Sequence, residues 1–376
     1  MLYFYGEVGK PMNHRKKYAA VTVISALLLI LCAVLGQAAP ALTAAEADST
    51  SDGAVLLSAP DGLTAEAAQP QAEEAKGGFK KFAEQWLPYI IAGISNGGQY
   101  ALIAIGYTMV YGILRLINFA HGDIFMCAGL MMVYLSATLN VFIAIPIVLI
   151  LTVLLGFLVE RCAYKPLRDA PRMSVMISAI GVSYLLQNLA FYITSGLAKQ
   201  YPVIPFLTKS IAIGSVQVKT VTIITPVLTV VLILLLQLLI KKTKIGMAMR
   251  AVSFDFETSR LMGVKINSVI SMTFIIGSFL AAVGSILFFS AYTTVTPTVG
   301  AMPGLKAFVA AVFGGIGSVP GAVIGAFIIG LVENIIKGIS GGEYSTFSDA
   351  FTFALLIVIL VVKPTGLFGE KLKEKV

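Results

Sequence analysis

The chain has 376 residues, of which 57% are hydrophobic and only 12% are charged, and its mean hydropathy is +0.89. Because soluble domains carry about 25% charged residues, this composition excludes an ordinary soluble protein. The net charge of +8 does not indicate nucleic-acid binding, since Lys and Arg lie in short loops between apolar segments, where they set membrane orientation. Apolar segments of nearly 20 residues favour helices over barrel strands, so we predict an all-α polytopic membrane protein.

The N-terminal part differs from the rest in composition. Residues 1–40 combine a basic start, a 17-residue apolar run and small residues, which predicts a secretory signal or an uncleaved anchor helix. Residues 41–85 are acidic and rich in Ala and Pro, which predicts a disordered external linker. This linker would end in a short interfacial helix at 79–87, anchored by Trp86.

We expect about eight core transmembrane helices within one transmembrane domain at residues 86–370, followed by a basic cytoplasmic tail at 371–376. The span at 174–194 carries Ser178, Ser183, Gln187 and Asn188, which indicates a face turned toward the bundle interior. The loop at 195–220 is expected to contain short strands at 203–207 and 215–221. Four glycines, Gly93, Gly97, Gly98 and Gly106, would let the first span pack closely on its neighbours. The expected spans are 89–113, 125–139, 141–159, 174–194, 221–240, 268–289, 305–336 and 351–362.

A glycine-rich break interrupts the apolar segment at 305–336. If this segment crossed once, the basic tail would lie outside, against the positive-inside rule. We therefore predict a broken or re-entrant element of two half-helices, because irregular backbone is tolerated in a membrane only where protein or a cavity surrounds it. The residues of the break are Gly314, Gly315, Gly317, Pro320 and Gly321.

A polar group follows the first span and consists of Asn118, His121, Gly122 and Asp123. One His and one Asp fall short of a usual metal set, so no metal is expected. Two interpretations remain: the side chains cap the next helix, or they form the wall or gate of a translocation pathway. We predict that this group and the glycine-rich break flank such a pathway.

The loop at 241–269 is the most polar interior loop. Residues 247–262 are expected to form one helix with an apolar ridge of Met249, Val252 and Leu261, stopped by Gly263. Such a helix either docks into a groove of a partner or lies on lipid headgroups. No glycine-rich phosphate loop is present, so if the protein is driven by ATP, the ATP and Mg would be used by another chain and this chain would need no cofactor. The candidate partner-contact residues of this segment are Arg250, Asp255, Glu257, Ser259, Leu261, Met262 and Gly263.

Two long segments carry a family resemblance. YALIAIGYTMVYGILRLINFAHGD at 100–123 and AFVAAVFGGIGSVPGAVIGAFIIGLVE at 307–333 resemble the two signatures of LivH-type branched-chain amino acid ABC transporter permeases, and the resemblance covers about residues 86–370. It implies import of Leu, Ile or Val across a bacterial inner or cytoplasmic membrane. The implied partners are a LivM-like second permease, two LivG/LivF-like ATPases and an extracytoplasmic substrate-binding protein, and the segment at 247–263 would be the coupling helix.

Other functions remain open at this point. Permeases for urea, amides or another amino acid share the NFAHG-type motif. A stand-alone secondary transporter or channel would need more ion-coupling groups in the membrane than this chain offers. An enzyme would need paired acids, a metal set or a nucleophile with its base, and the sequence shows none of these.

Overall fold

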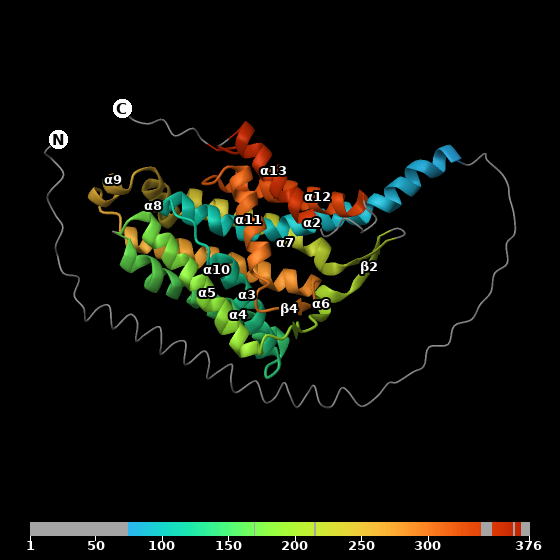
Figure 1. Ribbon diagram of the computed structural model, residues 1–376, viewed down its shortest axis with the longest axis horizontal. Coiled ribbons are helices and arrows are strands. Elements are labelled where there is room, and N and C mark those ends of the chain that lie inside the picture. Colours follow the sequence, from blue (N-terminus) through green and yellow to red (C-terminus); the bar gives the residue numbers. More distant parts are fainter. Residues whose placement is uncertain (1–73, 169, 214–215, 340–347, 364, 370–376) are drawn as a thin grey trace.

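The computed structural model describes residues 74–168, 170–213, 216–339, 348–363 and 365–369, and within them the protein is a bundle of helices (Figure 1). The expected signal or anchor at 1–40, most of the linker and the tail at 371–376 lie outside these residues. Five of the described helices are long and apolar enough to span a membrane, which confirms the polytopic helical class. The bundle consists of α2 (Glu74–Leu114), α3 (His121–Ser136), α4 (Val141–Val159), α5 (Arg172–Thr194), α7 (Thr220–Lys242), α10 (Ile266–Ala291), α11 (Ala301–Gly314), α12 (Val319–Ile339) and α13 (Ser348–Val362).

Helix α2 runs through the centre of the bundle, and its residues 101–105 are completely buried. A Cβ on Gly97 would lie 2.7 Å from Phe327 Cα in α12, and one on Gly98 would lie 3.1 Å from the Thr229 hydroxyl in α7. The prediction that glycines allow close packing of this span is confirmed. The separate interfacial helix expected at 79–87 is wrong, because α2 continues through Pro88 from Glu74. A proline removes one intrahelical hydrogen bond without having to end a helix.

The long loop after α5 holds short elements at one end of the bundle (Figure 1). Strands β2 (Ser210–Ile213) and β3 (Val216–Lys219) form an antiparallel hairpin, and β1 (Lys199–Gln200) pairs with β4 (Thr294–Val295). The strand expected at 215–221 is therefore close to β3. The strand expected at 203–207 is wrong, because α6 (Pro205–Thr208) begins there, with a proline at its first position, where helices accept it readily.

Helices α11 and α12 form a hairpin joined by residues 315–318, which confirms the predicted break. Gly315 and Gly317 have φ values of +105° and +100°, which side chains other than hydrogen disfavour. The two helices touch through their backbones, since a Cβ on Gly314 would lie 1.9 Å from the carbonyl oxygen of Gly321. Glycine is therefore required here both for the turn and for the close approach.

The C-terminal segment closes this hairpin. The backbone N–H groups of Leu367 and Phe368 donate to the carbonyls of Phe313 and Gly314, at 2.9 and 3.0 Å. Contacts also connect this end of the bundle to the loop after α7, because Arg115, just beyond α2, donates to the Ser253 carbonyl at 3.4 Å. The hairpin turn, the segment 365–369 and this loop thus share one end of the bundle. Only α11, with 14 residues, is as short as a half-helix; α12 has 21 residues and is long enough to span a membrane, so the prediction of two half-helices is wrong for α12.

Candidate functional site

The predicted polar group lies deep inside the bundle, where α3 begins. His121 packs against Gly106, which lies eight residues before the end of α2, or about 12 Å along the helix axis. Asn118 is 1% exposed, and His121 and Asp123 are each 2% exposed. Helix α3 therefore starts within the bundle rather than at its end, so its first residues meet side chains of several other helices.

The imidazole of His121 is wedged between two helices. A Cβ on Gly106 of α2 would lie 2.1 Å from His121 Nε2, and one on Gly277 of α10 would lie 3.5 Å from His121 Cε1. The ring of Tyr107 meets the imidazole edge to face, with centroids 5.0 Å apart. Nε2 has no hydrogen-bond partner among the described residues. A buried polar atom of this kind is costly, which is typical of a functional position.

The carboxylate of Asp123 is held by α5. Ser183 donates a short hydrogen bond to Oδ2, and Gln187 donates to Oδ1 at 2.9 Å. No cationic nitrogen forms an ion pair with Asp123 in the part of the chain that the structure describes. The prediction that Ser183 and Gln187 face the interior is confirmed. Asn188, by contrast, is exposed and donates to the Tyr184 carbonyl of its own helix at 2.7 Å, so its predicted interior position is wrong.

The side chain of Asn118 is hydrogen-bonded to the segment that follows α4. Its Oδ1 accepts from the Tyr164 hydroxyl at 2.9 Å, whereas its Nδ2 has no partner among the described residues. The N-cap of α3 is Ala120, and no side chain caps the helix. The interpretation that these side chains cap the next helix is therefore wrong. They reach across to neighbouring helices instead, although Asp123 still lies in the first turn, where the helix dipole favours an anion.

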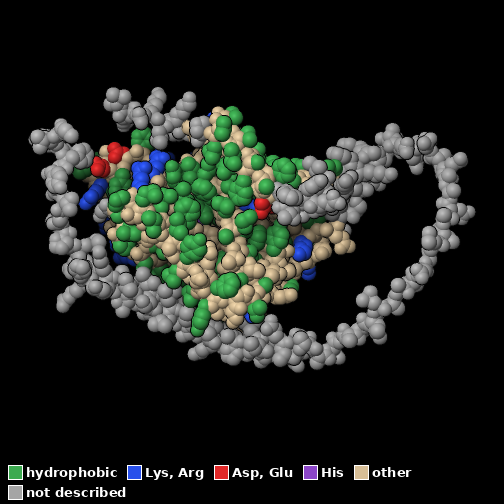
Figure 2. Space-filling model, viewed as in Figure 1, with side chains coloured by type: hydrophobic (Ala, Val, Ile, Leu, Met, Phe, Trp, Pro, Cys, Tyr) green, Lys and Arg blue, Asp and Glu red, His purple; other side chains and the backbone are tan. Residues whose placement is uncertain are grey.

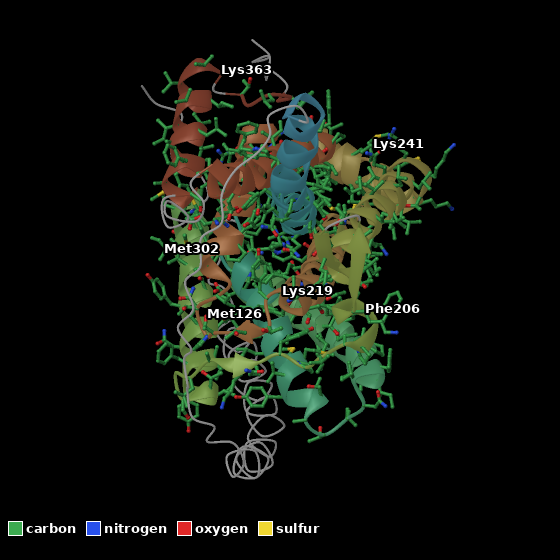
Figure 3. All side chains as sticks on the ribbon, turned by 90° about the vertical axis from the view of Figure 1, so that its right-hand side faces the viewer. Met126, Phe206, Lys219, Lys241, Met302 and Lys363 are labelled. Carbon is green, nitrogen blue, oxygen red and sulfur yellow. The ribbon has the colours of Figure 1, made fainter. Side chains whose placement is uncertain are left out.

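Gly122 brings α3 against the first turn of α11. A Cβ there would lie 2.6 Å from the Gly300 carbonyl oxygen and 3.1 Å from Gly304 Cα. Met126 of α3 and Met302 of α11 mark this crossing in Figure 3. The group of Gly314, Gly315, Gly317, Pro320 and Gly321 lies at the opposite end of α11, about 15 Å further along the helix axis. The structure thus joins the polar group to the start of α11 rather than to the glycine turn.

A buried charge network was missed by the sequence reasoning. Lys306 of α11 lies 2.9 Å from Glu333 of α12 and 2.7 Å from Asp349 of α13. Glu333 also accepts from Lys337 at 2.7 Å and from the Tyr100 hydroxyl at 2.9 Å. One Lys and one Glu within the apolar segment at 305–336 were the available signal, because charges in a membrane span pair with each other.

The predicted coupling helix is two helices. α8 (Lys244–Phe254) and α9 (Phe256–Leu261) meet at Asp255, whose carboxylate accepts from the N–H and the hydroxyl of Thr258, at 3.1 and 2.7 Å. The single helix expected at 247–262 is wrong, because this local hydrogen bonding favours a new helix start over continuation. Gly263, with φ of +83°, ends α9 as predicted.

The side chains of α8 and α9 divide into a packed and an exposed set. Met249 and Val252 are buried as expected, but Leu261 is 86% exposed, so it does not belong to the same ridge. Ser259 is also buried, whereas Arg250 and Glu257 are exposed. Charged side chains gather at this end of the molecule in Figure 2. The most exposed large apolar side chains of this loop are Phe254, Leu261 and Met262, and these three are called the exposed apolar surface below.

Comparisons with known proteins agree with this architecture. The family described as "Branched-chain amino acid transport system / permease component" matches residues 89–360. The chain is 37% identical over 305 residues to the high-affinity branched-chain amino acid transport system permease protein BraD of Pseudomonas aeruginosa, covering 77% of this chain and 98% of that protein. It is also 37% identical over 313 residues to LivH of Salmonella typhimurium, covering 78% and 100%.

A more distant relative carries another name. The ribose import permease protein RbsC of Haemophilus influenzae is 25% identical over 279 residues, covering 72% of this chain and 83% of that protein. No solved structure matches. The match to the family spans more than half of the chain, and the relatives at 37% identity are covered almost completely. The chain is a multi-pass membrane protein that belongs to the family of permease components of branched-chain amino acid transport systems.

Proposed function

We propose that this chain is a permease subunit of a bacterial ABC importer that takes up leucine, isoleucine and valine across the inner or cytoplasmic membrane. The observation that carries this proposal is the 37% identity, over nearly their whole length, to two relatives named as high-affinity branched-chain amino acid permeases. A relative that is 25% identical is named as a ribose import permease, so the fold alone does not determine the substrate. The substrate assignment therefore rests on the higher sequence identity to the branched-chain amino acid permeases.

The complete importer would contain a second permease subunit, two ATP-binding subunits and an extracytoplasmic substrate-binding protein. This chain has no phosphate-binding loop, so ATP and Mg would be bound by the partner subunits. ATP binding there would shift the permease between outward-open and inward-open states, which requires that nucleotide bind the two states with different affinity.

Asn118, His121 and Asp123 are proposed as part of the pathway wall or its gate. Support comes from their burial at the start of α3, from the two orphaned atoms, Asn118 Nδ2 and His121 Nε2, and from a carboxylate without a cationic partner among the described residues. Polar groups in this state inside a membrane bundle are expensive and mark substrate or ion pathways. The glycine turn at 314–321 would act less directly, by fixing the half-helix that packs on Gly122.

The exposed apolar surface of Phe254, Leu261 and Met262 is proposed as the contact with an ATP-binding subunit. These side chains are 80–86% exposed at the end of a loop that also carries exposed charges. Truncating a central apolar anchor of an interface costs about 2 kcal/mol or more of binding free energy, whereas rim charges contribute little. The apolar side chains should therefore matter more than Arg250 or Glu257.

The test is reconstitution with candidate ATP-binding subunits and a candidate substrate-binding protein from the same organism. The variant Leu261→Ser/Met262→Ser should lose co-purification with the ATPases and ATP-driven uptake of radiolabelled leucine. Phe206→Ser is the matched control, because Phe206 is 64% exposed in α6, which lies far from α8 and α9 (Figure 1).

Three outcomes would change the proposal. Leucine uptake by this chain without ATPases would assign it to secondary transporters. An intact complex that imports urea or another amino acid but no leucine would retain the ABC assignment and overturn the substrate. Equal loss in the Phe206→Ser control would show that the effect is unfolding and not docking.

A further inference from the structure

The end of α4 holds a charge that the proposed pathway does not use. Glu160 is completely buried, and both of its carboxylate oxygens are occupied: Oε1 lies 3.0 Å from Arg168 Nη2, and Oε2 accepts from the Ser271 hydroxyl at 2.8 Å. Arg168 also donates to Asn267 Oδ1. Because Ser271 and Asn267 belong to α10, this cluster connects the loop after α4 to the first turns of α10.

The backbone that carries Glu160 is unusual. Residues Glu160–Tyr164 form η1, one turn of π-helix that extends α4. Single π turns occur frequently at functional sites. At the other end of this turn, Tyr164 donates to Asn118 Oδ1 at 2.9 Å and packs against Phe274, with ring centroids 5.0 Å apart.

The cluster lies between the helices α8 and α9, which are proposed to contact an ATP-binding subunit, and the polar group at the start of α3. Asn267 follows Gly263, the end of α9, by only four residues, so a displacement of α9 acts directly on the start of α10. Asn118 precedes His121 by three residues, so Tyr164 holds the segment from which α3 starts. The Ser178 hydroxyl of α5 also donates to the carbonyl of Ala163 within η1, at 3.3 Å.

We propose that Glu160, Arg168 and Tyr164 are positioning residues that couple the ATPase-facing helices α8 and α9 to the polar group at the start of α3. This inference rests on the proposed function. When α10 shifts, Ser271 and Asn267 move relative to Glu160 and Arg168, and the π turn changes to α-helical hydrogen bonding. Because α-helical hydrogen bonds (i→i+4) close one residue earlier than π bonds (i→i+5), this change rotates Tyr164 about the helix axis and withdraws its hydroxyl from Asn118.

The consequence at the site is specific. Once Tyr164 leaves, both polar atoms of the Asn118 side chain lack a partner among the described residues, since Nδ2 already has none. Asn118 then favours a new arrangement of the segment before α3, and this segment carries His121 and Asp123. In this proposal the π turn is the element with two discrete arrangements that energetic coupling between distant sites requires.

The experiment uses the complete importer in proteoliposomes, with Tyr164→Phe as the test variant. This substitution removes one hydroxyl and leaves the ring contact with Phe274 in place. We expect normal assembly with the ATPases and normal ATP hydrolysis, but about two- to thirtyfold less leucine imported per ATP hydrolysed. Glu160→Gln, which removes the charge pair with Arg168, should lower the same ratio.

Tyr201→Phe is the matched control. Tyr201 is also buried, at 4% exposure, and its hydroxyl has no partner among the described residues, so its import per ATP should equal that of the unmodified importer. An unchanged ratio for Tyr164→Phe would overturn the coupling role. A proportional fall of assembly, hydrolysis and uptake would also overturn it, because that result indicates a purely structural contact. Absence of ATP-driven leucine uptake by the unmodified importer would instead refute the proposed function.

Discussion

The imidazole of His121 occupies the space that a side chain at position 106 would need, since a Cβ on Gly106 would lie 2.1 Å from His121 Nε2. The backbone of α2 and the ring at the start of α3 are therefore fitted to each other. A larger side chain at position 106 would displace the imidazole, and a larger side chain at position 121 would displace α2. The depth at which α3 begins in the bundle depends on this contact.

Gly106→Ala should lower thermal stability and uptake together. The added methyl group must move the imidazole or separate α2 from α3, and overpacking of this kind costs about 1–3 kcal/mol of unfolding free energy. Thermal unfolding of the purified protein in detergent measures this loss. Gly181→Ala in α5 is the matched control, because a Cβ there meets nothing within 4 Å. Equal melting temperatures for the two variants would contradict the close contact.

Asp123→Asn should separate function from stability. Asn has nearly the same shape, and removing a buried charge that lacks a cationic partner among the described residues should leave the melting temperature unchanged or raise it. Uptake should fall about tenfold or more, because in the proposed pathway a hydrogen bond from the transported substrate to this charged acceptor would contribute about 1.5–3 kcal/mol. Radiolabelled leucine uptake, corrected for the amount of folded complex, provides the measurement. Full uptake by this variant would exclude the carboxylate from the pathway.

Breaking the charge network around Glu333 should destabilise the hairpin of α11 and α12. Lys306→Met leaves Asp349 without this partner and Glu333 with one cation fewer, and removal of one member of a buried pair costs about 3 kcal/mol. The double variant Lys306→Met/Glu333→Gln should be less destabilised than the sum of the two single variants. The reason is that each single variant removes the same ion pair between Lys306 and Glu333 and leaves one member unpaired, whereas the double variant removes both members together. Lys241→Met, at an exposed position, is the control. Strict additivity of the unfolding free energies would refute the coupling.

The two glycines of the hairpin turn should differ in their tolerance of alanine. Gly317→Ala should cost about 1–2 kcal/mol through its positive φ alone, because a Cβ there meets nothing within 4 Å. Gly315→Ala should cost clearly more, since its Cβ would also lie 2.3 Å from Gly369 N. Melting temperatures of the two variants in the same detergent make the comparison. Equal losses would show that the segment at 367–369 does not press on the turn.

Local patterns predicted most of the individual elements. The broken element at 305–336, the packing glycines of α2, the stop at Gly263 and the inward face of Ser183 and Gln187 all depend on residues close together in the sequence. Their physical signals are short in range: backbone freedom at glycine, and the cost of polar groups in an apolar medium.

Contacts between neighbouring helices could not be predicted from such local patterns. That Gly122 meets Gly300, that Tyr164 reaches Asn118, and that Lys306 lies between Glu333 and Asp349 depend on which helices are neighbours. Within an apolar medium this choice follows from small differences in packing and hydrogen bonding that periodicity does not record. The break at Asp255 was missed for a different reason, because an Asp within an apparent helix can equally be the cap of a second one.

The attachment of residues 367 and 368 to the α11–α12 hairpin has a consequence for how the protein is made. The carbonyls of Phe313 and Gly314 receive their partners from residues that the ribosome adds more than fifty positions later. Until α13 has been inserted, a nascent hairpin carries two unmet backbone acceptors beside its glycine contacts. The hairpin of α11 and α12 is therefore completed only after α13 has been inserted and residues 367 and 368 have reached the carbonyls of Phe313 and Gly314.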